Sequence, residues 1–177
     1  MRRSADIAAE LMRENSVRNI RRLARWVGAD ADRFAAAMRA VLGADIAVAR
    51  RASWVVTLCV ERFPFLAEPW LGEMLRTADV PDDALQRNMM RSFQFVRVPP
   101  RRQGRVFNTA FGLLTSPRTS IAARAFSITV LANIAEEQPD LARELLMVLE
   151  EMLAQPLSAG ILSRARKTVR RLSHRAA

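Results

Sequence analysis

The stretches VRNIRRLARWVG (residues 17–28) and QRNMMRSFQFV (residues 86–96) start alike within a chain of 177 residues. Each has an Arg-Asn pair, one apolar residue and a basic residue on the next turn, and each ends in bulky apolar residues. Asn19 and Asn88 lie 69 residues apart. A recurrence at this distance indicates that one structural unit is used more than once along the chain.

The chain is divided by glycine and proline residues into segments whose apolar residues recur with a period near 3.6 rather than 2. Ser16, Asp30, Ser120 and Ser158 stand before such segments and can cap helix starts. We therefore predict no strand and ten helices, at residues 5–14, 17–27, 30–42, 46–60, 64–78, 84–97, 101–114, 121–135, 139–154 and 161–173.

Taken in order, the ten predicted helices form five pairs. The second helices of these pairs can be aligned with one another at one polar position, which is occupied by Asn19, Arg51, Asn88, Arg124 and Arg164. These residues are spaced by 32, 37, 36 and 40 residues, and the positions one, four and eight residues later fall on one helix face. A helix pair of this length is the unit of an α-solenoid. We predict an all-α, right-handed superhelix of about five helix pairs, as a single domain over residues 1–177 with a basic tail at 173–177.

A resemblance becomes visible in the same segments. The stretches ARRASWVVTLCVERFP (49–64), LQRNMMRSFQFV (85–96), IAARAFSITVLANIAEEQPDLARELLMVLEEML (121–153) and SAGILSRARKTVRRL (158–172) resemble the HEAT-like repeats of a small bacterial protein family, over residues 16–172. Some members of that family carry the name adenylosuccinate lyase. Resemblance to that lyase would imply a Ser-rich catalytic loop and a catalytic histidine. Such a loop is missing here, and the only histidine, His174, lies in the basic tail.

The composition limits the kinds of partner. The net charge of +10 comes almost wholly from arginine, since Lys167 is the only lysine, and the pI near 11.5 permits nucleic acid, anionic membrane or acidic protein as a partner. The single cysteine, Cys59, excludes an internal disulfide and a cysteine-rich metal site. The opening MRRSADIAAELM does not read as a signal peptide, and no uncharged run reaches the roughly 18 residues of a membrane span. We expect a cytoplasmic protein.

Charge differs between the two sets of predicted helices. The second helices of the pairs hold fifteen basic residues and no acidic residue, whereas the first helices hold eight basic and eleven acidic residues. Because second helices usually line the concave surface of a solenoid, this surface is predicted to be basic.

The residues one position before, three after and six after the aligned position form one stripe on each second helix. Arginine dominates this stripe, which the fourth repeat interrupts with Ala123, Ser127 and Val130. We predict an anion-binding groove; the alternative is a solvated face whose arginines lie over apolar neighbours. The predicted groove residues are Arg18, Arg22, Arg25, Arg50, Trp54, Arg87, Arg91, Lys167 and Arg170.

Two functions follow from this pattern. The first is a non-catalytic binding or adaptor protein that recognises an acidic protein or peptide on its basic concave face. The alternative is a nucleic-acid-binding protein, similar in architecture to the HEAT-like alkylpurine DNA glycosylases but without the acidic residue that those enzymes need in the groove. No cofactor, metal site, small-molecule substrate or membrane association is predicted. RRQGR (101–105) either extends the basic surface or starts a helix in solvent.

The alignment predicts a set of residues buried between helices, namely Ile20, Leu23, Val27, Val55, Cys59, Val96, Ile128 and Leu131. Replacing Leu131 with alanine should therefore lower the free energy of unfolding by about 2–5 kcal/mol, because the smaller side chain leaves a cavity. Urea denaturation measures this change. A loss of less than about 0.5 kcal/mol, the usual range for surface substitutions, would mean that the core face is placed wrongly.

Overall fold

The computed structural model describes residues 7–176, and within them it contains ten α-helices, one 3-10 helix and no strand. The all-helical prediction is confirmed. The elements are α1 (Ile7–Arg13), α2 (Val17–Val27), α3 (Ala31–Val41), α4 (Ile46–Arg62), η1 (Pro64–Trp70), α5 (Leu71–Ala78), α6 (Asp83–Phe93), α7 (Pro100–Thr115), α8 (Ile121–Ala135), α9 (Pro139–Leu153) and α10 (Ala159–Ala176).

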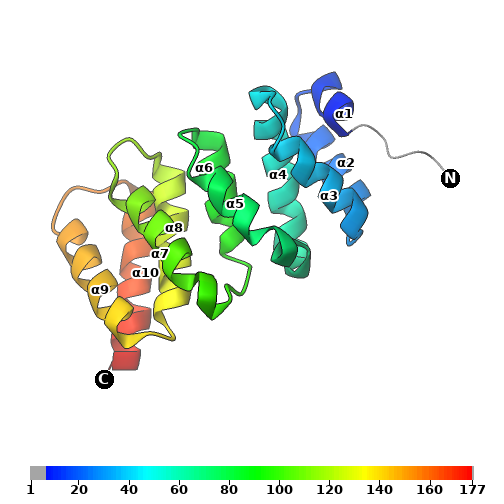
Figure 1. The fold of residues 1–177 in the computed structure, drawn as a ribbon. Coiled ribbons are helices and arrows are strands. Elements are labelled where there is room, and N and C mark those ends of the chain that lie inside the picture. The colour runs from blue at the N-terminus through cyan, green and yellow to red at the C-terminus, as the bar shows by residue number, and fades with distance from the viewer. Residues whose placement is uncertain (1–6, 177) are drawn as a thin grey trace. The chain divides into compact units, whose positions relative to one another are not determined.

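The chain forms two compact units, residues 1–96 and residues 97–177. In the first unit, α4 is the central helix and packs against α1, α2, α3, η1 and α6 (Figure 1). This helix has 17 residues, and nine of them are buried. The single domain over residues 1–177 and the right hand of the superhelix stay predictions.

The second unit contains two helix pairs. α8 packs against α7, α9 and α10, and α9 also packs against α10 (Figure 1). Nine of the 15 residues of α8 are buried, and eight of these nine are apolar. The predicted basic tail continues α10 as a helix to Ala176, while residue 177, like residues 5 and 6 of the first predicted helix, lies outside the described residues.

Most helix boundaries follow the local signals of the sequence. The predicted bounds of α2 and α8 match the structure, and Ser16 and Ser120 accept hydrogen bonds from amides of their first turns. The prediction of Ser158 as a cap is wrong, because its hydroxyl is buried without a hydrogen-bond partner among the described residues. The prediction of one helix over 64–78 is also wrong: a 3-10 helix containing Pro64 and Pro69 precedes α5, since proline lacks the amide hydrogen of an α-helical bond.

The repeat alignment is confirmed by burial. The positions one, four and eight residues after the aligned residue are buried in all five repeats, and none of these side chains is more than 8% exposed. They are Ile20, Leu23, Val27; Ala52, Val55, Cys59; Met89, Ser92, Val96; Ala125, Ile128, Ala132; and Ala165, Thr168, Leu172. The remaining residue of the predicted core, Leu131, is also buried. One face of each second helix therefore supplies the core.

The aligned polar residues bond across helices. Asn19 Nδ2 donates to the backbone carbonyls of Glu10 and Glu14, at 2.9 and 3.0 Å. Arg51 donates to the carbonyl of Leu11 at 2.9 Å, at the end of α1. Because the last carbonyls of a helix have no partner within the helix, these donors satisfy groups that burial would otherwise leave unpaired.

The other aligned residues follow two patterns. Arg124 Nε donates to the carbonyl of Leu114 at the end of α7, at 2.9 Å, as Arg51 does at the end of α1. Asn88 and Arg164 instead donate to hydroxyl groups on the preceding second helix, each 35 residues earlier in the chain: Ser53 Oγ at 2.8 Å and Thr129 Oγ1 at 2.6 Å. The aligned position thus joins neighbouring helices in every repeat.

A buried polar network joins α4 to α6. Thr57 Oγ1 lies 2.9 Å from the carbonyl oxygen of Asn88 and 3.0 Å from Ser92 Oγ, and Asn88 Nδ2 donates to Ser53 Oγ. Each of these four side chains is at most 7% exposed. Thr57 belongs to the predicted groove stripe, so that stripe faces α6 at this point rather than solvent.

Replacing Arg124 with methionine should lower the free energy of unfolding by about 1.5–3 kcal/mol, because it leaves the Leu114 carbonyl without its charged donor. Arg118 is exposed and precedes the same helix, so Arg118→Met is the matched control and should change stability by less than about 0.5 kcal/mol. Urea denaturation of both variants measures the difference. Equal effects would contradict a specific role for the bond between Arg124 and Leu114.

Candidate anion-binding site

A pocket of about 460 Å³ opens in the first unit between the C-terminal ends of α2 and α4. Arg21 and Arg25 of α2 line it together with Arg62 of α4. Its apolar lining includes Leu58, Cys59 and Phe63, and we refer to these six residues as the arginine pocket. None of the residues that line it is acidic.

The three arginines leave their charge available. Arg21 and Arg25 are four residues apart on α2, so they lie on the same side of the helix, and both are exposed. Among the described residues, neither has a carboxylate partner. The Arg62 guanidinium lies over the Phe63 ring, 5.4 Å from its centroid. An anion can therefore enter the pocket without displacing a bound carboxylate.

Cys59 belongs to the apolar lining. Its side chain is 2% exposed, and Sγ lies 3.7 Å from the Ala24 carbonyl oxygen. Burial raises the pKa of the Cys59 thiol to about 12, so the thiol stays neutral and is a poor nucleophile. This agrees with the interpretation of Cys59 as a buried structural residue.

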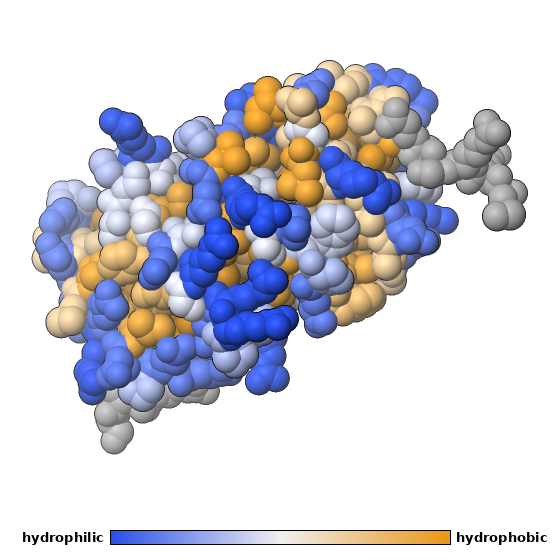
Figure 2. All heavy atoms as spheres, in the orientation of Figure 1, coloured by the Kyte–Doolittle hydropathy of each residue, from blue (hydrophilic) through white to orange (hydrophobic). Residues whose placement is uncertain are grey.

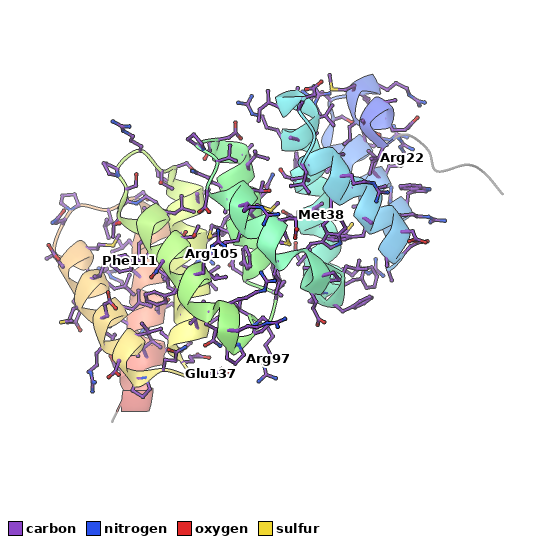
Figure 3. The ribbon with its side chains drawn as sticks, viewed as in Figure 1. Arg22, Met38, Arg97, Arg105, Phe111 and Glu137 are labelled. Carbon is purple, nitrogen blue, oxygen red and sulfur yellow. The ribbon has the colours of Figure 1, made fainter. Side chains whose placement is uncertain are left out.

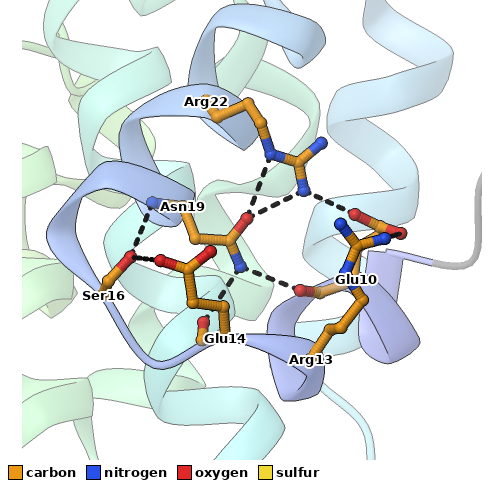
Figure 4. Close-up of polar contacts among 6 residues, drawn as sticks. All are labelled: Glu10, Arg13, Glu14, Ser16, Asn19 and Arg22. Atoms are coloured by element: carbon orange, nitrogen blue, oxygen red, sulfur yellow. Dashed lines mark hydrogen bonds and ion pairs between the residues drawn. The ribbon is translucent and has the colours of Figure 1, made fainter.

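Arg22, a predicted groove residue, is part of a polar cluster on α1 and α2 (Figure 4). Its guanidinium donates to Glu10 Oε2 at 2.5 Å and to Asn19 Oδ1 at 2.8 Å. Asn19 in turn binds the carbonyls of Glu10 and Glu14. The charge of Arg22 thus supports the junction between two helices.

Three other predicted groove arginines have carboxylate partners as well. Arg50 pairs with Asp82 at 2.6 Å, Arg87 with Asp83 at 3.1 Å, and Arg91 with Glu61 at 2.9 Å. The predicted segregation of charge needs correction here. α4 runs to Arg62 and α6 begins at Asp83, so these second helices include two acidic residues that the predicted bounds left out.

Asp82 has two functions at the start of α6. It caps the helix by accepting a hydrogen bond from the Leu85 amide, and it accepts another from Arg50 Nε at 2.8 Å. Burial alone would raise the pKa of Asp82, but the hydrogen bonds from Arg50 and the Leu85 amide hold this pKa below its ordinary value. The carboxylate is therefore charged and held in place at neutral pH.

The remaining predicted residues are distributed over α2, α4 and α10. Trp54 is half-buried on α4, and Arg18 is exposed one turn before Arg21 on α2. Lys167 and Arg170 are exposed on α10 in the second unit. Of the nine predicted groove residues, the arginine pocket includes Arg25.

Arg21 and Arg62 were missed by the sequence prediction. The four-residue spacing from Arg25 was a signal that could have identified Arg21. Arg62 lay beyond the predicted end of its helix at residue 60, because the aromatic residue and proline that follow made the helix end hard to place.

Comparison with known proteins identifies the repeats. The family model of a HEAT repeat domain matches residues 7–172. The chain belongs to this HEAT repeat family. HEAT repeats generally mediate protein–protein interaction or scaffolding and are typically non-catalytic. No match was found among curated proteins or among solved structures.

Membrane spans and metal sites were looked for in the part of the HEAT repeat chain that the structure describes. Within residues 7–176, no helix combines the length and apolar character of a membrane span. In the same part of the chain, no three His, Cys, Asp or Glu side chains gather as a metal site requires.

The raised pKa of Cys59 predicts a loss of stability at alkaline pH. Above the ordinary thiol pKa of 9.0 the unfolded chain loses this proton, while the folded protein keeps it up to a pKa of about 12. The free energy of unfolding should fall across this window by up to about 1.4 kcal/mol per pH unit. Urea denaturation on both sides of the ordinary thiol pKa measures this, and Cys59→Ala should lack the fall. An equal fall in that variant would contradict the assignment.

Proposed function

We propose that this HEAT repeat protein is a non-catalytic adaptor that binds an acidic segment of a partner protein at the arginine pocket. One observation carries the proposal: three arginines surround an apolar pocket whose lining contains no acidic residue. The arginines attract a carboxylate, and the apolar lining stabilises an apolar side chain that is buried beside it. The HEAT repeat itself favours a protein as the partner.

The arginines indicate the path of the bound segment. Arg18, Arg21 and Arg25 are spaced by three and four residues, so they form a row along α2. All three are exposed. Arginine binds a carboxylate through two parallel hydrogen bonds, so successive acidic side chains can be bound along this row.

The apolar lining supports an anchor residue in the same segment. Leu58 and Phe63 are half-buried, and together with buried Cys59 they leave an apolar surface for one large side chain of the partner. The volume of about 460 Å³ lies in the usual range of ligand pockets. We therefore propose a bulky apolar residue followed by acidic residues as the recognised pattern.

The lining also supports binding over catalysis. Besides arginine, which keeps its proton at all ordinary pH values, its titratable group is the neutral thiol of Cys59. General base catalysis needs a group that can accept a proton near neutral pH. The free thiol also suits the reducing cytoplasm, where we propose that the protein works.

The proposed site is narrower than the predicted concave groove. Arg22, Arg50, Arg87 and Arg91 have carboxylate partners, and an incoming anion would have to displace them. Each pair lowers the gain from binding a second anion, even the exposed pair of Arg87 and Asp83, which is worth little by itself. Arg18, Arg21 and Arg25 have no carboxylate partner among residues 7–176, so they are the stronger candidates.

A fluorescent peptide with one tryptophan followed by four glutamates tests the proposal by anisotropy. The double variant Arg21→Glu/Arg25→Glu should weaken binding at least tenfold, because two attractive charges become repulsive. Arg39→Glu on α3 is the matched control, since Arg39 is exposed and outside the pocket, and it should change affinity less than twofold.

The peptide itself is varied in the same assay. Glutamine in place of glutamate should abolish binding, and alanine in place of tryptophan should weaken it several-fold. Failure of the wild-type protein to bind the peptide, or equal losses in the pocket variant and the Arg39→Glu control, would overturn the proposal.

A further inference from the structure

The start of α7 and the segment just before it carry a dense basic cluster in the second unit, formed by Arg97, Arg101, Arg102 and Arg105. All four arginines are exposed, and none forms an ion pair with a described residue. Figure 2 shows hydrophilic side chains gathered over this part of the molecule, and Figure 3 labels Arg97 and Arg105 on the same face.

The exposed side of α7 is polar along its length. Arg101, Arg105, Asn108, Gly112 and Thr115 are spaced by four and three residues, so they form one stripe, and each of them is exposed. The helix contains no acidic residue. A Cβ atom added at Gly112 would meet no atom within 4 Å, so another chain can approach the helix closely there.

The start of α7 adds positive potential to the cluster. The helix has 16 residues and begins at Pro99-Pro100 without a side-chain cap and without an acidic residue in its first turn. The positive end of the helix dipole therefore coincides with the arginines. Gln103, by contrast, is buried. Its side-chain amide donates to the Glu137 carboxylate at 3.4 Å, so the partner of Glu137 here is an amide and not one of the four arginines.

The surrounding unit has a strong charge imbalance. Residues 97–177 contain thirteen basic and six acidic residues, a net charge of +7 out of +10 for the whole chain. Residues 1–96 contain fifteen basic and twelve acidic residues, and several of these form the ion pairs described above. A long-range attraction for polyanions therefore comes mainly from the second unit.

We propose that this basic face of α7 binds the phosphate backbone of nucleic acid. The side chains on the stripe are of the types that contact phosphates, namely arginine, asparagine and threonine, together with a helix N-terminus. Phe111 is half-buried and the other large apolar side chains of α7 are buried, so the stripe itself presents no apolar anchor of the kind found in a protein-binding hot spot. The arginine pocket on α2 and α4 has such an apolar lining, and this distinguishes the two sites.

We expect binding at this face to depend on the phosphate charge of the nucleic acid and not on its base sequence. Arg101 and Arg105 lie one turn apart, so they can reach neighbouring phosphates, and each phosphate contact contributes about 0.9 to the slope of log affinity against log salt concentration. The proposal goes beyond the adaptor function, because it uses other residues, another unit of the chain and another class of partner.

Fluorescence anisotropy with a labelled random-sequence DNA duplex tests the inference, in a series of salt concentrations. The double variant Arg101→Gln/Arg105→Gln should weaken binding at least tenfold at low salt and reduce the salt slope by about two. The matched control Arg39→Gln/Arg76→Gln removes the same charge from two exposed residues of the first unit that lie outside both sites, and it should keep affinity within twofold. Circular dichroism and thermal unfolding show whether each variant is folded.

The other outcomes overturn the inference. Absence of duplex binding by the wild-type protein does so, and so do equal losses in the two double variants, which would mean that net charge alone matters. Displacement of the duplex by polyglutamate at equal charge concentration would also overturn it, because the face would then accept any polyanion. The Trp-Glu peptide assay with the Arg21→Glu/Arg25→Glu variant tests the adaptor function separately, so each proposal can fail alone.

Discussion

One hydrogen bond recurs through both units, from a polar side chain of a second helix to a carbonyl or hydroxyl oxygen on, or just beyond, a neighbouring helix. At Asn19, Arg51 and Arg124 the acceptors are backbone carbonyls at or just beyond the end of a first helix. A helix end that is packed against other helices needs such a donor, because its last carbonyls have no partner of their own. The residues one, four and eight positions later are buried in every repeat, and all but Ser92 and Thr168 are apolar. Polar satisfaction and core packing therefore depend on the same alignment of helices.

This dependence explains how much of the fold the sequence could predict. The alignment on Asn19 and its counterparts identified the repeats, and the apolar offsets identified the core, because both follow from helical periodicity. Helix ends were less certain. Pro64 and Pro69 changed an α-helix into a 3-10 helix, and α6 ends at Phe93 rather than at residue 97. In these segments the chemistry of proline and the packing of the chain, rather than the local helix propensity, determine where the α-helices begin and end.

The candidate site was harder to predict, because ion pairs join residues that are distant in sequence. Arg91 pairs with Glu61 and Arg50 with Asp82, and the partners are 30 and 32 positions apart in the sequence. A count of charges for each helix cannot find such pairs. It also cannot show that the ends of α2 and α4 meet around a pocket, which depends on how the two helices pack. The sequence predicted arginine as the anion-binding residue type, and the structure shows which of these arginines pair with carboxylates and which do not pair with any described carboxylate.

The buried network between α4 and α6 has a consequence for how the chain can evolve. Ser53, Thr57, Asn88 and Ser92 satisfy one another across two repeats, and they are almost inaccessible to water. Loss of the Ser53 hydroxyl would leave the buried Asn88 Nδ2 without this acceptor, so these two positions are coupled across the repeats. A duplicated or shuffled repeat inserted between α4 and α6 would separate the partners. Insertion of a repeat at this junction is therefore disfavoured, because it would bury Asn88 Nδ2 without its acceptor.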